Sequence, residues 1–435
     1  MSRHPLTVEI SNEVDLTINK VLPHDKVFSI QVGHRLFRAS GLSLSSDSPS
    51  YFTKFFSEDA NKDKVLFLDR NPRIFEMIYN HLQGYPLDIN NDYDFVHLWL
   101  DSLYFGLRKL QKFLISEDIF ANVGNRTFKI AKSLFVNTGN YPNYFTVLYD
   151  GLFHENIDHI VVKGILRPPP LRPATVCRSP DLFADLIGLL RGSLDVIRND
   201  EHRRLLIREC KYYRFLELEQ RIVKHKIINN PFSPYRQEIV IDLFDIHPKG
   251  VVNDSPPDKL KEVPLKYQRP FLSKEPKRSL IFQLDTTANP DILGYSEVKL
   301  VLNKNVHVPI VHITHKLATR MQYAFQEFSG EFTTQEISPF PCIIFTLGFA
   351  GCKSIINGRE MKELWIHDII GKDEKAGSEP PAKKRKEVEG DLIEFRLTRS
   401  LWRMVMRGKM ARVHAVSIEG FTDQTEFLRN ELDFL

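Results

Sequence analysis

The sequence predicts an α+β protein in which a strand-and-helix module occurs twice and is followed by a mainly antiparallel β domain. Two observations lead to this prediction. A pattern of glycine, proline and aromatic residues between Val27 and Leu114 returns about ninety to a hundred residues later. Beyond Asn229, helical periodicity gives way to short alternating apolar runs divided by turn residues. The predicted segments are a leader at 1–26, modules at 27–116 and 117–228, and a β-rich domain at 229–435.

The first module begins with a predicted pair of strands. Apolar and polar residues alternate from Phe28 to Val32, and Gly33 follows at the position of a turn. The return strand starts at Leu36. A further short strand is predicted at 65–68, because four apolar residues stand there between polar neighbours.

Two helices are predicted to follow these strands. Asn71 suits the N-cap of the first helix, and Pro72 suits its first helical position. Gly84 provides the stop signal. The apolar face of this helix repeats every 3.6 residues and consists of Phe75, Ile78, Tyr79 and Leu82. The second helix is predicted from about Asp94 to Phe105.

The second module repeats these residues at offsets that grow along the chain. The offset is 91 from Val32 to Val123 and 93 from Pro49 to Pro142. It is 108 throughout the first helix and beyond, where Pro180, Phe183, Leu190, Gly192 and Tyr212 match Pro72, Phe75, Leu82, Gly84 and Tyr104. We assign the last fifteen added residues to a proline-rich stretch at 167–173, between a strand predicted at 160–162 and the helix.

These residues resemble the signature of the BTB/POZ domain, in its potassium-channel tetramerisation-type branch. The signature residues are Val32, Gly33, Phe37, Pro49, Phe52, Asp69, Arg70, Pro72, Phe75, Leu82, Gly84, Tyr104 and Phe105. The Asp-Arg-Asn-Pro run is its most specific part. The second module has Cys177 and Arg178 in place of the Asp-Arg pair, so it resembles a divergent copy. The family usually has a second glycine at His34 and an alanine at Ser102.

The resemblance implies a function in assembly. Domains of this family associate with themselves and with other proteins and have no active site, so we expect a homo-oligomeric adaptor or scaffold that is not an enzyme. Cullin-type ubiquitin ligase scaffolds and signalling phosphatases are partners that the family implies. The tandem arrangement is similar to that of uncharacterised fungal proteins of this branch. The short join at 112–118 predicts that the two modules form a rigid pair.

Composition excludes several other classes of protein. The chain has 435 residues, of which 42% are hydrophobic and 26% charged, as in soluble globular proteins. Its net charge of +4 gives little reason to expect nucleic-acid binding. The longest apolar stretch, at 342–350, is too short for a membrane helix. Four widely spaced cysteines predict neither a zinc site nor a disulfide framework, and we expect no cofactor or metal.

A basic run lies in a polar segment at 372–391 that is predicted to be a disordered loop of the β domain. The run follows two prolines and consists of Lys383, Lys384, Arg385 and Lys386. It resembles a monopartite nuclear localisation signal, which an import receptor would bind. The competing interpretations are a solvated run of charge and a site for another acidic partner. We expect the nucleus as the main location, with the cytoplasm as a second one.

The β domain, which resembles no family that we identified, carries further candidates. We expect a sandwich with one helix near 317–327. A basic stripe runs through its last strands at Arg396, Arg399, Arg403, Arg407, Lys409 and Arg412. The stripe suits either a nuclear regulator that binds nucleic acid or the exposed face of a half-buried sheet, which we favour. His307, His312 and His315 have no metal-ligand spacing, and Gly348 to Ser354 does not fit a phosphate loop.

Overall fold

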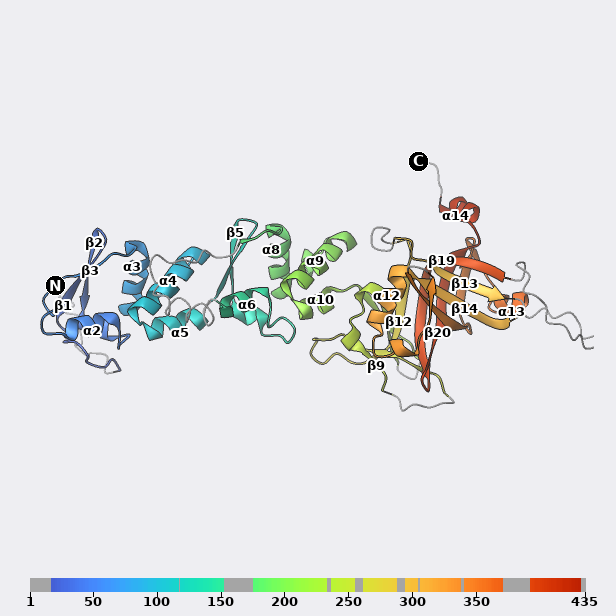
Figure 1. The fold of residues 1–435 in the computed structure, drawn as a ribbon, viewed down its shortest axis with the longest axis horizontal. Helices are drawn as coiled ribbons and strands as arrows, with labels where there is room; N and C mark the ends of the chain where they lie inside the picture. Colours follow the sequence, from blue (N-terminus) through green and yellow to red (C-terminus); the bar gives the residue numbers. More distant parts are fainter. Residues whose placement is uncertain are drawn as a thin grey trace, which may run out of the picture. The chain divides into compact units, whose positions relative to one another are not determined.

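The computed structural model describes residues 17–116, 118–151, 175–232, 236–254, 261–287, 294–303, 306–337, 340–370 and 392–431 (Figure 1). The chain divides into an N-terminal unit, Met1–Glu219, and a C-terminal unit, Gln220–Leu435. Within the described ranges, no helix has the length and apolar character needed to cross a membrane.

The first half of the N-terminal unit is built on a three-stranded sheet of order β2-β1-β3. Strand β1 (Val27–Val32) pairs antiparallel with β2 (Arg35–Ser40) and parallel with β3 (Leu66–Leu68). Gly33 supplies the turn between β1 and β2 with a positive φ of 54°, a conformation that glycine adopts without strain. The strands predicted from alternation are therefore confirmed.

The described part of this half has two helices between β2 and β3 and three after β3. They are α1 (Gly41–Ser45), α2 (Tyr51–Ser57), α3 (Pro72–Leu82), α4 (Asp92–Phe105) and α5 (Arg108–Ser116). Helix α3 begins as predicted, because the Asn71 side chain accepts a hydrogen bond from the Arg73 amide at 2.9 Å. Helix α4 begins two residues earlier than predicted, since its N-cap is Asn91.

Aromatic side chains hold α3 against the sheet and the neighbouring helices. Phe75 on α3 is only 1% exposed. Its ring centroid lies 4.9 Å from Phe37 on β2, 5.9 Å from Phe52 on α2 and 6.0 Å from Phe105 on α4. One ring thus connects four elements, so the position of α3 depends on it.

The second half of the N-terminal unit repeats the strand order as β5-β4-β6. Strand β4 (Ile119–Val123) pairs antiparallel with β5 (Arg126–Ile130) and parallel with β6 (Thr175–Val176). The helical segments are η1 (Lys132–Phe135), α6 (Tyr144–Asp150), α8 (Pro180–Leu190), η3 (Leu194–Val196), α9 (Asp200–Tyr213) and α10 (Leu216–Ile222).

The structure corrects one prediction about this half. Val123 pairs with Val176 as Val32 pairs with Leu68, so β6 is the counterpart of β3 at the offset of 108. The counterpart strand predicted at 160–162 was therefore wrong, and the fifteen added residues precede the strand. Residues 160–162 and the proline-rich stretch at 167–173 lie outside the described residues.

The C-terminal unit is built on strands that form one connected network. They are β7 (His225–Asn229), β8 (Gln237–Asp242), β9 (Val251–Val252), β10 (Val263–Pro264), β11 (Lys266–Tyr267), β12 (Arg278–Asp285), β13 (Val298–Asn303), β14 (Val306–Thr314), β15 (Thr333–Ile337), β16 (Phe340–Gly348), β17 (Lys353–Ile356), β18 (Arg359–Glu360), β19 (Leu392–Arg407) and β20 (Met410–Phe421). Most pairings are antiparallel, whereas β8–β12, β16–β20 and β17–β20 are parallel.

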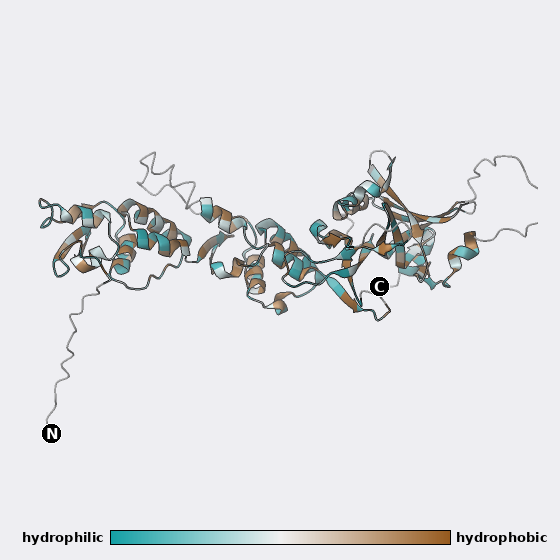
Figure 2. Ribbon diagram, turned by 90° about the horizontal axis from the view of Figure 1, so that it is seen from below, coloured by the Kyte–Doolittle hydropathy of each residue, from teal (hydrophilic) through white to brown (hydrophobic). Residues whose placement is uncertain are grey.

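The predicted sandwich was wrong, because the described strands β13, β14, β16, β19 and β20 pair in a closed ring. Strand β19 pairs with both β13 and β20, and the circuit continues from β13 through β14 and β16 back to β20. One row of paired residues across this circuit is buried and forms its core: Phe395, Leu300, Val311 and Phe345. Figure 2 shows both hydrophobic and hydrophilic stretches on the strands of this unit.

Helices complete the C-terminal unit. They are α12 (His315–Ala324), α13 (Trp365–Ile370) and α14 (Gln424–Glu431), with short turns at η4 (Leu243–Asp245), η5 (Pro248–Gly250) and η6 (Ser329–Glu331). The helix predicted near 317–327 is α12. Arg320 on α12 donates hydrogen bonds to the carbonyl oxygens of Leu243, Phe244 and Ile246, so α12 is fastened to η4.

The contacts of Phe75 predict the result of its truncation. Phe75→Ala should lower the free energy of unfolding by about 3–5 kcal/mol, because it removes a buried ring and leaves a cavity among three other rings. Chemical denaturation of the full chain measures this change. Tyr85→Ala, at an exposed site, should cost far less. An equal loss in both variants would contradict the assignment of Phe75 to the core.

Candidate protein-interaction surface

A buried arginine joins the end of β3 to helix α4. The Arg70 guanidinium donates to the Asp101 carboxylate at 3.1 Å and lies 4.1 Å from the centre of the Tyr104 ring. The side chains of Arg70 and Asp101 are only 7% and 5% exposed. Two charges at this depth are tolerated because they pair with each other and because the ring face attracts the cation.

The same arrangement occurs in the second half. Arg178 donates to Glu209 at 2.8 Å and lies 4.3 Å from the ring centre of Tyr212. All three residues stand 108 positions after their counterparts. Sequence analysis treated Cys177 and Arg178 as the loss of the Asp-Arg pair, whereas the structure retains the arginine and its contacts. The shared offset of Asp101 and Glu209 was the signal that could have revealed this.

The other signature residues shape the core. Val32, Phe37, Phe52, Leu82 and Phe105 are buried. Gly33 and Gly84 have positive φ angles, and Pro49 follows a cis peptide bond, as Pro142 does in the second half. Asp69 is exposed. The signature therefore defines a fold and does not assemble catalytic groups.

An exposed apolar surface lies on the outer face of the β2-β1-β3 sheet. We call it the outer sheet face, and it comprises Val27, Leu36, Val65 and Phe67, which are 59%, 48%, 53% and 62% exposed. Gln31 on β1 pairs with both Leu36 and Phe67, so these two side chains flank it on one face. Sequence analysis did not identify this surface. The run of four apolar residues at 65–68, where a half-buried strand would alternate, was the available signal.

The equivalent face of the second sheet is covered at Phe120, whereas Thr127 and Thr175, the counterparts of Leu36 and Phe67, are exposed and polar. Phe120, the counterpart of Ser29, is only 4% exposed. Its ring lies 5.4 Å from Phe95 on α4, which also lies 5.5 Å from Tyr149 on α6. Helix α4 of the first half thus packs on the second sheet. Both halves belong to one compact unit. The packing of α4 on β4 agrees with the prediction that the two modules form a rigid pair.

Four of the five arginines of the basic stripe contact carboxylates of the C-terminal unit. The pairs are Arg396 with Glu297 at 3.2 Å, Arg399 with Glu419 at 2.7 Å, Arg403 with Glu238 at 2.9 Å and Arg412 with Glu262 at 2.5 Å. Each pair neutralises a cation that a phosphate would otherwise contact. This geometry fits the exposed face of a sheet better than a nucleic-acid surface.

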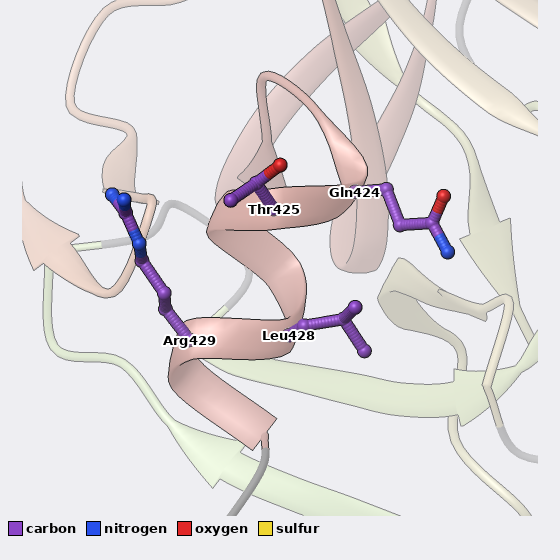
Figure 3. Close-up of a pocket in the computed structure, with 4 residues that line it drawn as sticks. All are labelled: Gln424, Thr425, Leu428 and Arg429. Atoms are coloured by element: carbon purple, nitrogen blue, oxygen red, sulfur yellow. The ribbon is translucent and has the colours of Figure 1, made fainter.

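The remaining candidates give no site. No three histidine, cysteine or acidic side chains come together to bind a metal among the residues that the structure covers. Gly351 turns the chain into β17, where Ser354 is buried. A shallow hollow on α14 is lined by Gln424, Thr425, Leu428 and Arg429, of which Gln424 and Leu428 point to one side of the helix and Arg429 to the other (Figure 3). The basic run from Lys383 to Lys386 lies outside the described residues.

The buried carboxyl of Asp101 predicts a pH dependence. Burial raises its pKa to about 6, although Arg70 opposes the shift. Between pH 3.8 and 6 the folded chain keeps a proton at Asp101 that the unfolded chain has lost, so stability falls as pH rises. The unfolding free energy of the wild type relative to Asp101→Asn should decrease by about 3 kcal/mol across this range. Denaturation at several pH values measures it, and a constant difference would contradict the raised pKa.

Comparisons with known proteins identify a matching family model and two similar yeast proteins. Residues 236–431 match the family described as the YLR108C C-terminal domain. The BTB/POZ domain-containing protein YLR108C of Saccharomyces cerevisiae is 42% identical over 236 residues, 54% of this chain and 48% of that protein, which supports a BTB-like relationship. The uncharacterized protein YDR132C of the same yeast is 35% identical over 383 residues, 75% of each chain. The chain therefore belongs to the family of YDR132C.

Proposed function

We propose that the chain is a non-enzymatic adaptor or scaffold of the nucleus that self-associates through two consecutive BTB/POZ folds and binds other proteins. Three observations support the proposal. A relative carries the BTB/POZ name. The two halves of the N-terminal unit share strand order and an arginine that contacts both a carboxylate and a tyrosine ring. The outer sheet face leaves apolar side chains exposed.

The outer sheet face is the observation that supports self-association most directly. Apolar residues gathered on a sheet face lose contact with water when a second surface covers them. In the second half Phe95 of α4 covers the equivalent face at Phe120, and the counterparts of Leu36 and Phe67 are the threonines Thr127 and Thr175. The face of the first half therefore exposes apolar side chains where the second half exposes threonines, and it is the better candidate for contact between chains.

Nuclear location rests on the basic run alone. Four consecutive cations behind two prolines suit the acidic groove of an import receptor. A nuclear regulator that binds nucleic acid has weaker support, because four of the five arginines of the stripe contact carboxylates. A cullin-type scaffold or a phosphatase as partner rests on family resemblance, and none of the described residues favours either.

The oligomeric state tests self-association. Light scattering after size exclusion should give the full chain the mass of a defined oligomer. Leu36→Ser with Phe67→Ser should shift that mass toward the monomer, because each serine reduces the apolar area that the contact buries. Tyr85→Ser with Leu194→Ser replaces two other exposed apolar residues and should leave the mass unchanged. A monomeric wild type would overturn the proposal.

A fluorescent fusion tests nuclear location. Lys384→Ala with Arg385→Ala removes the two central cations, so the fusion should move from the nucleus to the cytoplasm. Microscopy measures the ratio of the two signals. Lys62→Ala with Lys64→Ala removes two exposed cations elsewhere and should leave the ratio unchanged. Full nuclear retention of the first variant would refute the assigned signal.

A further inference from the structure

An apolar hollow lies in the second half of the N-terminal unit, at the end of α5. We call it the β4 slot. It has a volume of about 480 Å³, and its lining includes Ile115, Lys132, Phe135, Val136, Tyr141 and Tyr149. Ile115, Val136 and Tyr141 are 40%, 76% and 57% exposed, whereas Phe135 and Tyr149 are buried. Aromatic and aliphatic walls of this kind suit an apolar side chain.

The first half shows what fills the corresponding position there. Lys132 and Val136 stand 91 residues after Gly41 and Ser45 on α1. Leu22 lies against these residues, is only 2% exposed and donates its amide hydrogen to the Ser45 hydroxyl at 3.2 Å. Leu22 thus occupies in the first half the place that is hollow in the second.

Gly41 makes this occupation possible. A Cβ atom at position 41 would lie 1.9 Å from the carbonyl oxygen of Pro23, which no side chain could tolerate. The segment that carries Leu22 and Pro23 therefore passes directly over α1. The Gly41 amide also donates to the Lys26 carbonyl at 2.8 Å, which fixes the segment as it enters β1.

Among the residues that the structure describes, the second half has no equivalent segment in this place. The residues before β4 form helix α5, whose Leu114 is buried. Position 132 is a lysine, which donates from its Nζ to the carbonyl oxygen of Ile115 at the rim. The same fold thus contains one filled site and one open site.

We propose that the β4 slot binds an extended segment of a partner protein that inserts a leucine side chain, as Leu22 does within the chain. The inference rests on the proposed adaptor function, because it assigns that function a partner site. It uses residues separate from the outer sheet face, so self-association and partner binding fail independently. Asp150 at the slot provides a carboxylate that can accept a hydrogen bond from the backbone of the segment.

A peptide with the sequence of residues 19–26, Asn-Lys-Val-Leu-Pro-His-Asp-Lys, is the probe. It is titrated into the full chain, in which isoleucine and valine methyl groups carry a carbon-13 label for NMR. We expect saturable shifts of the Ile115 and Val136 methyl signals. A peptide with alanine in place of its leucine should bind about tenfold more weakly, because it buries less apolar surface.

Two variants of the chain make the test specific. Val136→Ser should weaken binding several-fold, whereas Leu194→Ser, at another exposed apolar site, should leave it unchanged. Lys132→Gly should strengthen binding. Without a side chain at position 132, the bound segment can pass as close to the backbone as Leu22 and Pro23 pass to Gly41. Light scattering on Val136→Ser should return the wild-type mass, which separates this site from self-association.

Three results of the binding experiments would overturn the proposal. These are the absence of methyl shifts at millimolar peptide, equal binding of the leucine and alanine peptides, and equal losses in Val136→Ser and Leu194→Ser. Because the probe acts on the intact chain, a change of oligomeric state in Val136→Ser would likewise contradict a site that is independent of self-association.

Discussion

The N-terminal unit depends on a buried arginine that must keep two partners at once. Arg70 follows β3, and its partners Asp101 and Tyr104 lie on α4. Removal of Arg70 or of Asp101 would leave the other side chain of the pair buried without its charged partner. This costs far more free energy than a surface ion pair gains. The end of the strand and the helix are therefore fixed in relative position. The counterpart pair in the second half is Arg178 with Glu209, where the carboxylate side chain is longer and the arginine is 34% exposed.

The internal repeat separates what the fold requires from what each half does with its surface. The turn glycine, the helix-starting proline, the central phenylalanine and the arginine contact occur in both halves. The surfaces differ. The first half exposes Phe67 where the second has Thr175, and it fills with Leu22 the position that the second leaves open. These differences indicate surfaces that are free to contact other molecules, since the shared core does not need them.

Local signals allowed much of this fold to be predicted. Asn71 and Pro72 begin α3 because they satisfy the start of a helix through neighbouring residues alone. Long-range pairings were harder to predict. The closed circuit depends on β19, whose sixteen residues pair with β13, β12 and β10 along one edge, and no local pattern specifies such partners. The counterpart of β3 was misplaced because another apolar run near 160 had the expected composition. The outer sheet face and the β4 slot need tertiary packing to be recognised.

The two proposed surfaces gain significance when they act together. One leucine side chain in an open slot provides only weak binding, because most of the interaction offsets the entropy lost on association. A self-associating chain presents one β4 slot per copy, so a partner with several leucine-bearing segments would bind at high effective concentration after its first contact. Assembly would then turn a weak site into a selective one, since partners with a single segment would dissociate quickly. An adaptor built in this way needs no catalytic group, and its specificity lies in the number and spacing of the segments it holds.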